Sequence, residues 1–353
     1  MITYQDDLIT LYRANALNLP LADDSVDLVV TSPPYFGLRS YQDGGEHYEG
    51  QIGAEATPDE FVDALIAATR EMVRVTKPSG SIWVNLGDKY AGGGGYAPDA
   101  PSNVGNNRHG DGKGGARSAS NRGAAWGYKP KSLIGIPWRY AIRCIDDLCL
   151  VLRAEVIWSK PNGLPESVTD RVRRSHEHWF HFTLEPRYYS AVDEVREAHL
   201  RTWGPGNNGG HAHRLAQAGV NAESNLDQSS PNPLGKLPGS VWTVPTEPLR
   251  VPDHLGIDHF AAFPTEWPRR IIQGWSPEGG VVLDPFSGTG TTALVASVLG
   301  RHGIGVDMSE DYCRLAAWRT TDPKQRARAA RKPWTPPAEQ LPGQEALDFG
   351  GVL

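Results

Sequence analysis

The sequence predicts a doubly wound α/β fold, in which helices cover both faces of a mostly parallel sheet. Apolar runs such as "VDLVV" and "VVLD" have almost no polar interruption, which is typical of strands buried on both faces. These runs alternate with amphipathic helical segments, and a glycine-rich turn follows the run at 281–284. A chain of 353 residues is long enough to bury such a core and to carry insertions as well.

Local patterns predict the individual elements. The helix signal is clearest at 57–76, where Thr57 is a suitable N-cap, Pro58 takes the first helical position and Glu60 completes a capping box. The "KPSG" at 77–80 should end this helix. The expected strands are 10–15, 26–31, 81–88, 150–161, 176–186, 279–286 and 301–307. The expected helices are 57–76, 130–148, 265–276, 290–300 and 309–321, the last with Ser309 as its N-cap.

Composition divides the chain into regions. Residues 91–127 hold too few apolar side chains to build a core, which predicts a mobile glycine-rich loop. Residues 191–255 are irregular and polar, and we expect an inserted recognition or lid region there. The core should therefore come from two parts, 1–190 and 256–320, followed by a loosely ordered tail at 321–353.

Charge and composition exclude several classes of protein. The formal net charge of −6 argues mildly against a partner as acidic as nucleic acid, although local basic faces can still exist. The first residues resemble no signal peptide and no stretch is apolar enough to span a bilayer, so we expect a cytoplasmic protein without membrane contact. The three cysteines lack metal-ligand spacing, and His176, Glu177 and His178 alternate on a predicted strand with no further ligand nearby. We expect no metal.

The segment "TSPPY" at 31–35 places a rigid corner at the end of a buried strand. Pro33 and Pro34 cannot donate ladder hydrogen bonds, so the strand stops there. The corner offers main-chain carbonyl oxygens without a competing N–H, and Tyr35 stands beside them. Taken alone, the pattern also fits a stiff loop with a half-buried tyrosine.

The turn "DPFSGTG" lies between a predicted strand and a predicted helix. Gly288 and Gly290 allow backbone angles that side chains forbid, and they let a ligand approach the main chain. The turn is not a Walker loop, because no Gly-Lys-Ser/Thr follows, and it does not match GxGxxG, because Gly290 is followed by Thr291, Thr292 and Ala293. Asp307, one strand later, can bind both hydroxyls of a ribose, so the turn suits a nucleoside with little or no phosphate. The alternative is a packing turn beside an acidic strand end.

Together, "TSPPY" and "DPFSGTGTT" resemble the catalytic and cofactor motifs of the amino-group DNA methyltransferases, which modify N4 of cytosine or N6 of adenine. The catalytic motif comes first, an order that resembles the circularly permuted β group of this family. "LIGIPWRYA", "LRAEVIWSKPNGLPESVTDR" and "HEHWFHF" are similar to its middle segment. The resemblance covers roughly 10–190 and 255–320. It implies a Rossmann-like methyltransferase fold, S-adenosylmethionine as cofactor and double-stranded DNA as partner.

The resemblance also implies roles for single residues. Ser32, Pro33, Pro34 and Tyr35 would be catalytic: carbonyl oxygens accept the amine of a flipped-out base, and Tyr35 stacks on its ring. "RANAL" is similar to a cofactor-contacting segment that more often has Asp at the position of Asn15, and "DHFAAFPTEWPRRII" to the segment that closes over the methionine end. The implied cofactor-binding residues are Asn15, Ala16, Phe263, Asp284, Pro285, Phe286, Gly288, Gly290, Thr291, Thr292 and Asp307.

Basic side chains in "KPN" and "DRVRRSHEH" are the candidate DNA contacts. They would suit phosphate oxygens, although a solvated basic face gives the same pattern. The candidate DNA-binding residues are Lys160, Asn162, Arg171, Arg173 and Arg174.

The acceptor base is expected to be cytosine, with adenine as the alternative. A serine before Pro-Pro-Tyr is usual in the family's cytosine N4 enzymes, and aspartate is usual in its adenine N6 enzymes. The absence of a Pro-Cys motif argues against the covalent route of ring-carbon cytosine methylases. A non-catalytic nucleotide-binding module and an RNA or protein methyltransferase stay open as other classes. The recognition sequence, a cognate restriction endonuclease as partner and homodimer formation also stay open.

Overall fold

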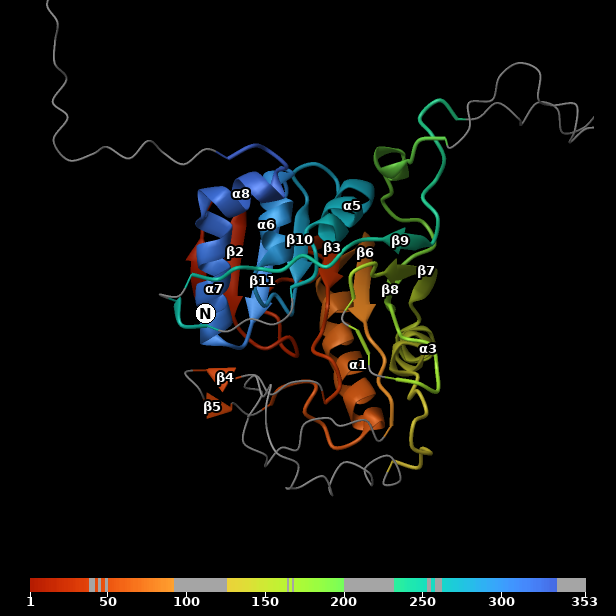
Figure 1. The fold of residues 1–353 in the computed structure, drawn as a ribbon. Helices are drawn as coiled ribbons and strands as arrows, with labels where there is room; N and C mark the ends of the chain where they lie inside the picture. The colour runs from red at the N-terminus through yellow and green to blue at the C-terminus, as the bar shows by residue number, and fades with distance from the viewer. Residues whose placement is uncertain are drawn as a thin grey trace, which may run out of the picture.

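The computed structural model describes residues 1–334 apart from 38–41, 44–45, 48–49, 92–125, 164, 167, 200–231, 253–254 and 258–261. A nine-stranded sheet runs through this part of the chain, in the order β1-β2-β11-β10-β3-β6-β8-β7-β9 (Figure 1). Its strands are β1 (Ile2–Gln5), β2 (Ile9–Arg13), β3 (Val26–Thr31), β6 (Thr76–Leu86), β7 (Val151–Ser159), β8 (His176–Thr183), β9 (Val241–Thr243), β10 (Val281–Asp284) and β11 (His302–Asp307). A separate two-stranded sheet joins β4 (Gln42–Asp43) and β5 (Glu46–His47).

The sheet is assembled from both ends of the chain. β2, β11, β10, β3 and β6 are parallel to their neighbours in that order, whereas β8 pairs antiparallel with both β6 and β7. The C-terminal strands β10 and β11 therefore lie between the N-terminal strands β2 and β3. This order places the turn after β10 beside the corner after β3, and the expected mostly parallel sheet is confirmed.

Helices cover both faces of the sheet (Figure 1). One face carries α1 and α3, and the other carries α5, α6 and α7, with α8 packed on α6 and α7. Alternate residues of β3 enter the two cores, with Val29 on the α1 side and Leu28 and Val30 on the α5 side. The helices are α1 (Pro58–Val75), α3 (Ile136–Leu148), α5 (Glu266–Trp275), α6 (Thr291–Val298), α7 (Glu310–Thr321) and α8 (Pro323–Ala329), with a 3-10 turn η1 (Val192–Val195).

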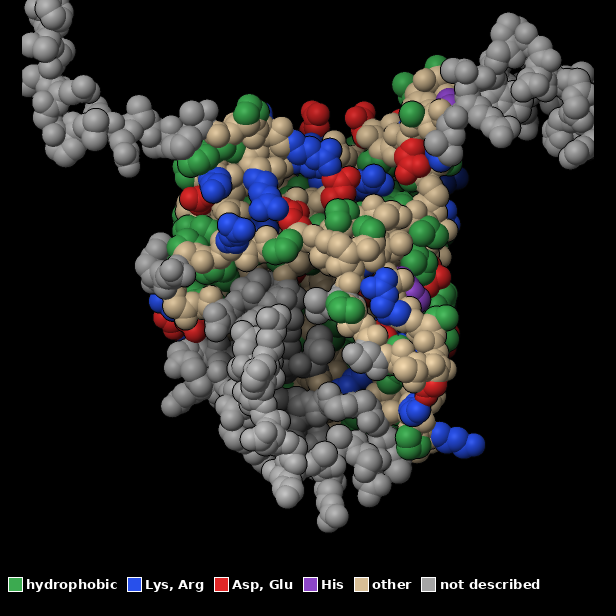
Figure 2. Space-filling model, viewed as in Figure 1, with side chains coloured by type: hydrophobic (Ala, Val, Ile, Leu, Met, Phe, Trp, Pro, Cys, Tyr) green, Lys and Arg blue, Asp and Glu red, His purple; other side chains and the backbone are tan. Residues whose placement is uncertain are grey.

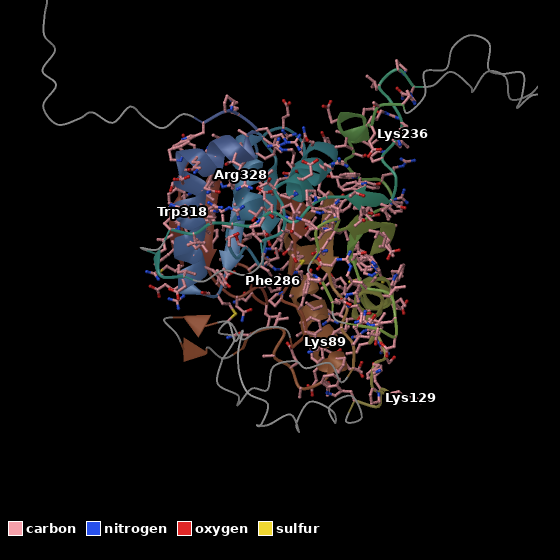
Figure 3. All side chains as sticks on the ribbon, in the orientation of Figure 1. Lys89, Lys129, Lys236, Phe286, Trp318 and Arg328 are labelled. Carbon is pink, nitrogen blue, oxygen red and sulfur yellow. The ribbon has the colours of Figure 1, made fainter. Side chains whose placement is uncertain are left out.

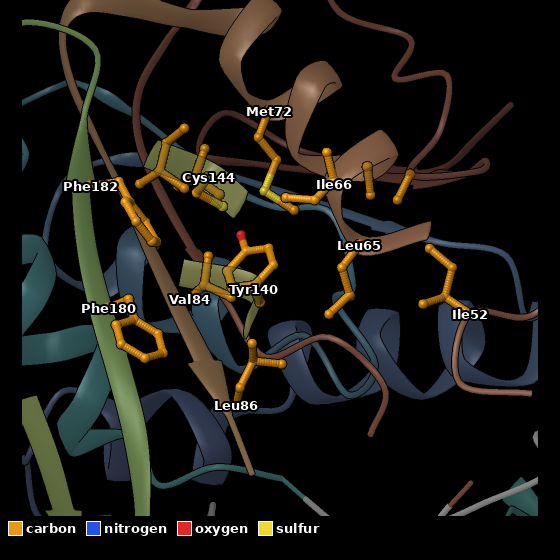
Figure 4. Close-up of a cluster of buried hydrophobic side chains, with 14 of the residues drawn as sticks. Ile52, Leu65, Ile66, Met72, Val84, Leu86, Tyr140, Cys144, Phe180 and Phe182 are labelled. Carbon is orange, nitrogen blue, oxygen red and sulfur yellow. The ribbon is translucent and has the colours of Figure 1, made fainter. Parts of the chain in front are cut away.

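The core on the α1 side joins three segments that are distant in sequence. Figure 4 shows Tyr140 and Cys144 of α3 between the α1 side chains and the aromatic residues Phe180 and Phe182 of β8. Tyr140 is 1% exposed, and its hydroxyl lies 2.9 Å from the Thr69 hydroxyl of α1. This packing fixes β8 against β6, which is the strand next to the corner.

Capping explains where the helices begin. Thr57 accepts from the Glu60 N–H and the Glu60 side chain accepts from the Thr57 N–H, so the expected capping box is present. Ser309 caps α7 by accepting from the Tyr312 N–H, as expected. Asp322 caps α8 in the same manner, and this helix lies in the segment expected to be loosely ordered.

Three further features differ from the sequence expectation. The "KPSG" segment at 77–80 lies inside β6, where the register against β3 jumps from Val26–Thr76 to Leu28–Ser81. It is therefore an irregularity within a strand that starts directly after α1. β1 is a short, mostly exposed edge strand, and β9 adds a sheet edge within the region expected to be irregular.

The surface carries mixed charge. Figure 2 shows Lys and Arg side chains interspersed with Asp and Glu on the face that carries α5, α6 and α8. No helix in the described ranges has both the length and the apolar character that crossing a bilayer requires. The expected mobile loop at 91–127 lies outside the described residues except for its two ends.

Candidate active site

The carboxyl ends of β2, β11, β10 and β3 meet at one edge of the sheet. Arg13 is in register with Asp307, and the Ala14 N–H donates to the Asp307 carbonyl oxygen at 3.0 Å. β10 and β3 pair through Leu283 and Val29, just before their two motifs begin. The structure therefore brings "RANAL", "TSPPY", "DPFSGTG" and Asp307 to one edge, where folds of this class bind ligands.

The glycine-rich turn leaves open space at its centre. Gly288 and Gly290 have φ angles of 48° and 74°, in the left-handed region. A Cβ atom at Gly290 would lie 3.0 Å from Ala316, so this glycine lets α6 and α7 pack closely. At Gly288, no described atom lies within 4 Å of the Cβ position, so a ligand can approach the main chain there. Asp307 stands beside this space because Oδ2 accepts from the Gly288 N–H and Oδ1 from the Ser309 N–H, both at 2.9 Å.

Asp284 joins the turn to the catalytic corner. Its Oδ1 accepts from the Thr31 hydroxyl at 2.6 Å and the Phe286 N–H at 3.1 Å, and its Oδ2 lies 2.9 Å from the Thr292 hydroxyl. Burial raises the pKa of Asp284 to about 6 against the lowering effect of these hydrogen bonds. A carboxyl group that is 0% exposed cannot reach a ligand. Asp284 therefore supports the turn from inside, whereas the motif implied a cofactor contact.

Other residues of the motif also support the turn from below. Arg319 of α7 is 4% exposed and donates to the hydroxyls of Thr289 at 2.5 Å and Thr291 at 2.7 Å. Burial lowers the pKa of Arg319 to about 10. Thr291, Thr292 and Pro285 are buried, so they hold the turn in shape. Arg319 was not predicted from the sequence, because it lies on a separate helix.

Three more predicted cofactor residues border the same edge, and a fourth packs in the core on the α5 side. Asn15 accepts from the Leu17 N–H at 2.9 Å, which shapes the turn after β2, and Ala16 is buried beneath it. Phe286, labelled in Figure 3, is half-buried and packs on the core of the α1 side. Phe263 instead belongs to the core on the α5 side, where its ring meets Trp179 edge to face at 5.9 Å.

The Pro-Pro corner is linked to β6 through Asn85. The Ser32 hydroxyl donates to Asn85 Oδ1 at 3.2 Å, and the Tyr35 hydroxyl lies 2.8 Å from the same oxygen. Asn85 Nδ2 donates to the His178 carbonyl oxygen at 3.1 Å, which fixes the orientation of the amide. Asn85 is 1% exposed. Sequence reasoning missed this residue, since it lies inside an apolar strand with no motif of its own.

Gly87 and Lys89, which follow β6, also contact the segment around the Pro-Pro corner. A Cβ atom at Gly87 would lie 2.7 Å from the Tyr35 ring, so the ring rests directly on the main chain there. Lys89, labelled in Figure 3, donates to the Gly37 carbonyl oxygen at 3.0 Å, and its ammonium lies 5.2 Å from the centre of the Phe36 ring. The chain on both sides of Tyr35 is therefore tied to β6 and its following loop.

An ion pair reaches the same tyrosine from β7 and β8. The Tyr35 hydroxyl lies 2.7 Å from Glu177 Oε2, and Glu177 Oε1 pairs with the Lys160 ammonium. That ammonium also lies 4.0 Å from the centre of the Trp158 ring. The Lys160 side chain is only 19% exposed. Lys160 is thus directed at the corner, although we expected it to meet phosphate.

The remaining predicted DNA-binding side chains differ in their exposure and in their contacts within the protein. Asn162 bonds the main chain of Thr246 through both its oxygen and its nitrogen. Arg171 pairs with Glu166 at 2.7 Å and stacks on Tyr90. Arg173 is exposed and donates to the Gly163 carbonyl oxygen at 3.2 Å, and the half-buried Arg174 lies beside the Tyr90 ring. Among the three arginines, Arg173 is the exposed one.

Metal-ligating side chains do not gather in the described part of the chain, where no group of three or more His, Cys, Asp or Glu could hold an ion. His178 Nδ1 instead lies 2.6 Å from Glu155 Oε1. The site therefore consists of the open glycine-rich turn, the Asp307 carboxylate that main-chain N–H groups hold beside it, and the Pro-Pro-Tyr corner with its hydrogen-bond partners. These features define an α/β protein with an open glycine-rich turn and an acidic strand end next to an aromatic corner.

Comparison with known proteins identifies the family. A family model described as DNA methylase, of the N6 and N4 methyltransferases, matches residues 26–317. The chain is 36% identical over 297 residues to "Type II methyltransferase M.SmaI" of Serratia marcescens, covering 84% of each chain. It is 37% identical over 313 residues to "Type II methyltransferase M.XycI" of Xanthomonas campestris pv. cyanopsidis, covering 87% of this chain and 86% of the relative.

The chain therefore belongs to the DNA methylase family, and the resemblance in its motifs is confirmed. Among solved structures, the PvuII DNA methyltransferase, described as cytosine-N4-specific, matches with a TM-score of 0.58 at 19% identity, and the match covers 92% of each chain. This likeness confirms the fold class.

Proposed function

We propose that this chain transfers a methyl group from S-adenosylmethionine to N4 of a cytosine that has been flipped out of duplex DNA. The observation that carries the proposal is the adjacency of the two motifs. Thr31, the residue before Ser32, is hydrogen-bonded to Asp284 at the start of the glycine-rich turn. A ligand on the turn and a base at the corner would therefore be neighbours.

The residues of the turn fit S-adenosylmethionine. The open space at Gly288 admits a nucleoside against the main chain, and the Gly288 and Ser309 N–H groups hold the Asp307 carboxylate beside this space, where an acidic side chain can bind ribose hydroxyls. Asn15 and Phe286 border the same edge and suit the adenine. No cluster of basic side chains for a phosphate group lies in the turn itself, which agrees with a cofactor that has none. When bound, the cofactor supplies an electrophilic methyl group on a sulfonium.

The corner supplies acceptors for an amine. Pro33 and Pro34 have no N–H, so the corner itself supplies no donor that competes for the carbonyl oxygens of Ser32 and Pro33. By accepting hydrogen bonds from the exocyclic amine, they free its lone pair for attack and hold it in line. Tyr35 stacks on the flipped ring. These groups are fixed before the substrate arrives, which is electrostatic preorganisation.

Ser32 supports cytosine as the target. In the free protein its hydroxyl donates to Asn85, another uncharged side chain, at 3.2 Å. A hydroxyl can turn to donate to ring nitrogen N3 while it accepts from the amine, whereas an ionised carboxylate can only accept. Adenine N6 is the alternative, since adenine also presents a ring acceptor beside its amine.

Relatives support a role in restriction and modification. The relatives named above are called Type II methyltransferases, and an "Orphan methyltransferase M.BamHII" of Bacillus amyloliquefaciens is 25% identical over 300 residues. We therefore propose a site-specific enzyme with a cognate restriction endonuclease, and residues 191–255 as the region that reads the target sequence.

A methyl-transfer assay with competing acceptors tests this proposal. The purified protein is incubated with S-adenosylmethionine labelled in its methyl group and with duplex DNA, RNA or protein from a host that lacks DNA methylation. Label should enter duplex DNA alone. Label in RNA or protein would contradict the proposal, and binding of the cofactor without any transfer would favour a non-catalytic module.

A further inference from the structure

The hydroxyl of Tyr35 faces two acceptors and has one proton. Asn85 Oδ1 lies at 2.8 Å and Glu177 Oε2 at 2.7 Å. The Asn85 amide cannot exchange its oxygen for its nitrogen, since Nδ2 already donates to the His178 carbonyl oxygen. The tyrosine therefore donates to one of these two groups at a time.

Glu177 is the stronger of the two acceptors. A hydrogen bond to an ionised carboxylate is roughly twice as strong as one to a neutral amide. Asn85 Oδ1 has a second donor available in Ser32, at 3.2 Å. The favoured arrangement directs the Tyr35 proton to Glu177 and the Ser32 proton to Asn85, so both hydroxyls of the corner are held.

Lys160 makes this arrangement possible. The Glu177 side chain is 14% exposed, and a carboxylate in such a place needs a compensating charge. Lys160 supplies it through Oε1, so Oε2 stays available to the tyrosine. Trp158 faces Glu177 in the β7–β8 register and lies against the Lys160 ammonium, so two paired strands hold the ion pair.

We propose that Glu177, clamped by Lys160, is a positioning residue that fixes the Tyr35 hydroxyl and thereby the plane of the ring on which the target base stacks. This inference rests on the proposed function, since it takes Tyr35 to be the stacking residue. The Lys160–Glu177 pair would then act on the rate of methyl transfer, and neither member would need to touch DNA or cofactor.

A double-mutant cycle tests the inference. Glu177→Gln keeps the shape of the side chain and removes its charge, and Tyr35→Phe keeps the ring and removes the hydroxyl. Each should lower the single-turnover rate of methyl transfer roughly 10-fold with unchanged affinity for S-adenosylmethionine, by analogy with loss of a charge-assisted hydrogen bond. The double variant should be no slower than the slower single variant. Losses that multiply would overturn the inference.

Lys160 variants separate positioning from phosphate binding. Lys160→Met should lower the rate without changing how DNA affinity depends on salt, and Lys160→Arg should recover most of it. A reduced salt dependence with an unchanged rate would show a phosphate contact and overturn the inference. If Lys160→Met fails to fold, the double variant Lys160→Met/Glu177→Gln replaces it, because this variant leaves no unpaired charge in the site. Its rate of methyl transfer should match that of Glu177→Gln alone. Any other rate overturns the inference.

A matched ion pair serves as the control. Lys131 and Asp170 pair at 2.6 Å but are 82% and 56% exposed, and Lys131→Met should leave the transfer rate unchanged.

The Tyr35 variants distinguish failure of this inference from failure of the proposed function. If Tyr35→Phe is fully active while Tyr35→Ala is not, the positioning role is wrong and the stacking role survives.

Discussion

Thr31 donates a 2.6 Å hydrogen bond to Asp284, and both side chains are 0% exposed. Thr31 ends β3, immediately before the Pro-Pro corner, and Asp284 ends β10, immediately before the glycine-rich turn. These residues lie 253 positions apart in sequence, yet their contact joins the two motifs directly. The two motifs are therefore held together by a buried hydrogen bond.

Asp284 should make stability depend on pH. Its pKa is raised to about 6 from an ordinary value of 3.8, so between these values the unfolded chain is ionised while the folded protein keeps the proton. Stability should then fall as the pH rises through this window, by about 3 kcal/mol for a shift of about two units. A protonated Asp284 also explains why the Thr292 hydroxyl can contact both Asp284 and the Val30 carbonyl oxygen, at 2.9 Å and 3.2 Å.

Urea unfolding at pH 4 and pH 7 measures this effect. Asp284→Asn should lack this part of the pH dependence and should gain stability relative to the unmodified protein as the pH rises. Asp7→Asn, at an exposed position, serves as the control. Parallel pH profiles for the unmodified protein and Asp284→Asn would contradict the assigned pKa.

Gly288→Ala should weaken cofactor binding more than it weakens the fold. The new methyl group would occupy the open space at the turn, where no described atom lies within 4 Å, and the left-handed backbone costs about 1–2 kcal/mol. Gly279→Ala is a matched control, because Gly279 also has a positive φ and an open Cβ position but lies before β10. Calorimetry should show an affinity for S-adenosylmethionine reduced at least about 10-fold in Gly288→Ala alone, a change of about 1.4 kcal/mol. Equal affinities in the two variants would remove the turn from the cofactor site.

Arg173→Gln should weaken binding to duplex DNA and reduce its dependence on salt. Loss of one phosphate contact lowers the slope of log affinity against log salt by about 0.9. Arg187→Gln is the control, since Arg187 is exposed near the opposite edge of the sheet, past the carboxyl end of the antiparallel strand β8. Fluorescence anisotropy at several salt concentrations measures both slopes. If Arg187→Gln lowers the slope as much as Arg173→Gln does, the basic segment has no special role.

Tyr35→Ala should slow methyl transfer by roughly 10-fold to 100-fold, since base stacking contributes about 1–3 kcal/mol. Cofactor affinity should change little, because the Tyr35 ring rests on Gly87 and its hydroxyl contacts Asn85 and Glu177, all of which lie outside the turn. Single-turnover rates and calorimetry on the same preparation measure the two quantities. Tyr189→Ala, at an exposed tyrosine, is the control. A loss confined to cofactor binding would show that Tyr35 does not stack on the base.

Much of the site could be predicted from the sequence, because its main parts are continuous motifs. Proline chemistry alone places a corner after β3, and the glycines with a following helix place the turn after β10. The partners of Tyr35 could not be predicted in this way. Asn85 and Glu177 lie 50 and 142 residues away from it, and they meet it only because β6 and the antiparallel β8 follow β3 in the sheet.

Local composition did not predict the tertiary contacts at two positions. Lys160 was predicted to meet phosphate because of its charge, and in the structure its ammonium pairs with Glu177 of the neighbouring strand. The basic segment "PKQRARA" was expected to be loose, although the Asp322–Pro323 pair is a helix-start signal and Ala329 packs in the core on the α5 side. In both places, contacts with distant parts of the chain determined the local structure, which the charge of the segment alone does not predict.

Identification of the methylated nucleoside tests the central claim most directly. Duplex DNA from a host without DNA methylation is treated with the protein and S-adenosylmethionine, digested to nucleosides and analysed by mass spectrometry. The presence of uncharged Ser32 and Asn85 at the corner leads us to predict N4-methylcytosine as the product. N6-methyladenine as the only product would contradict the assignment of cytosine as the target base.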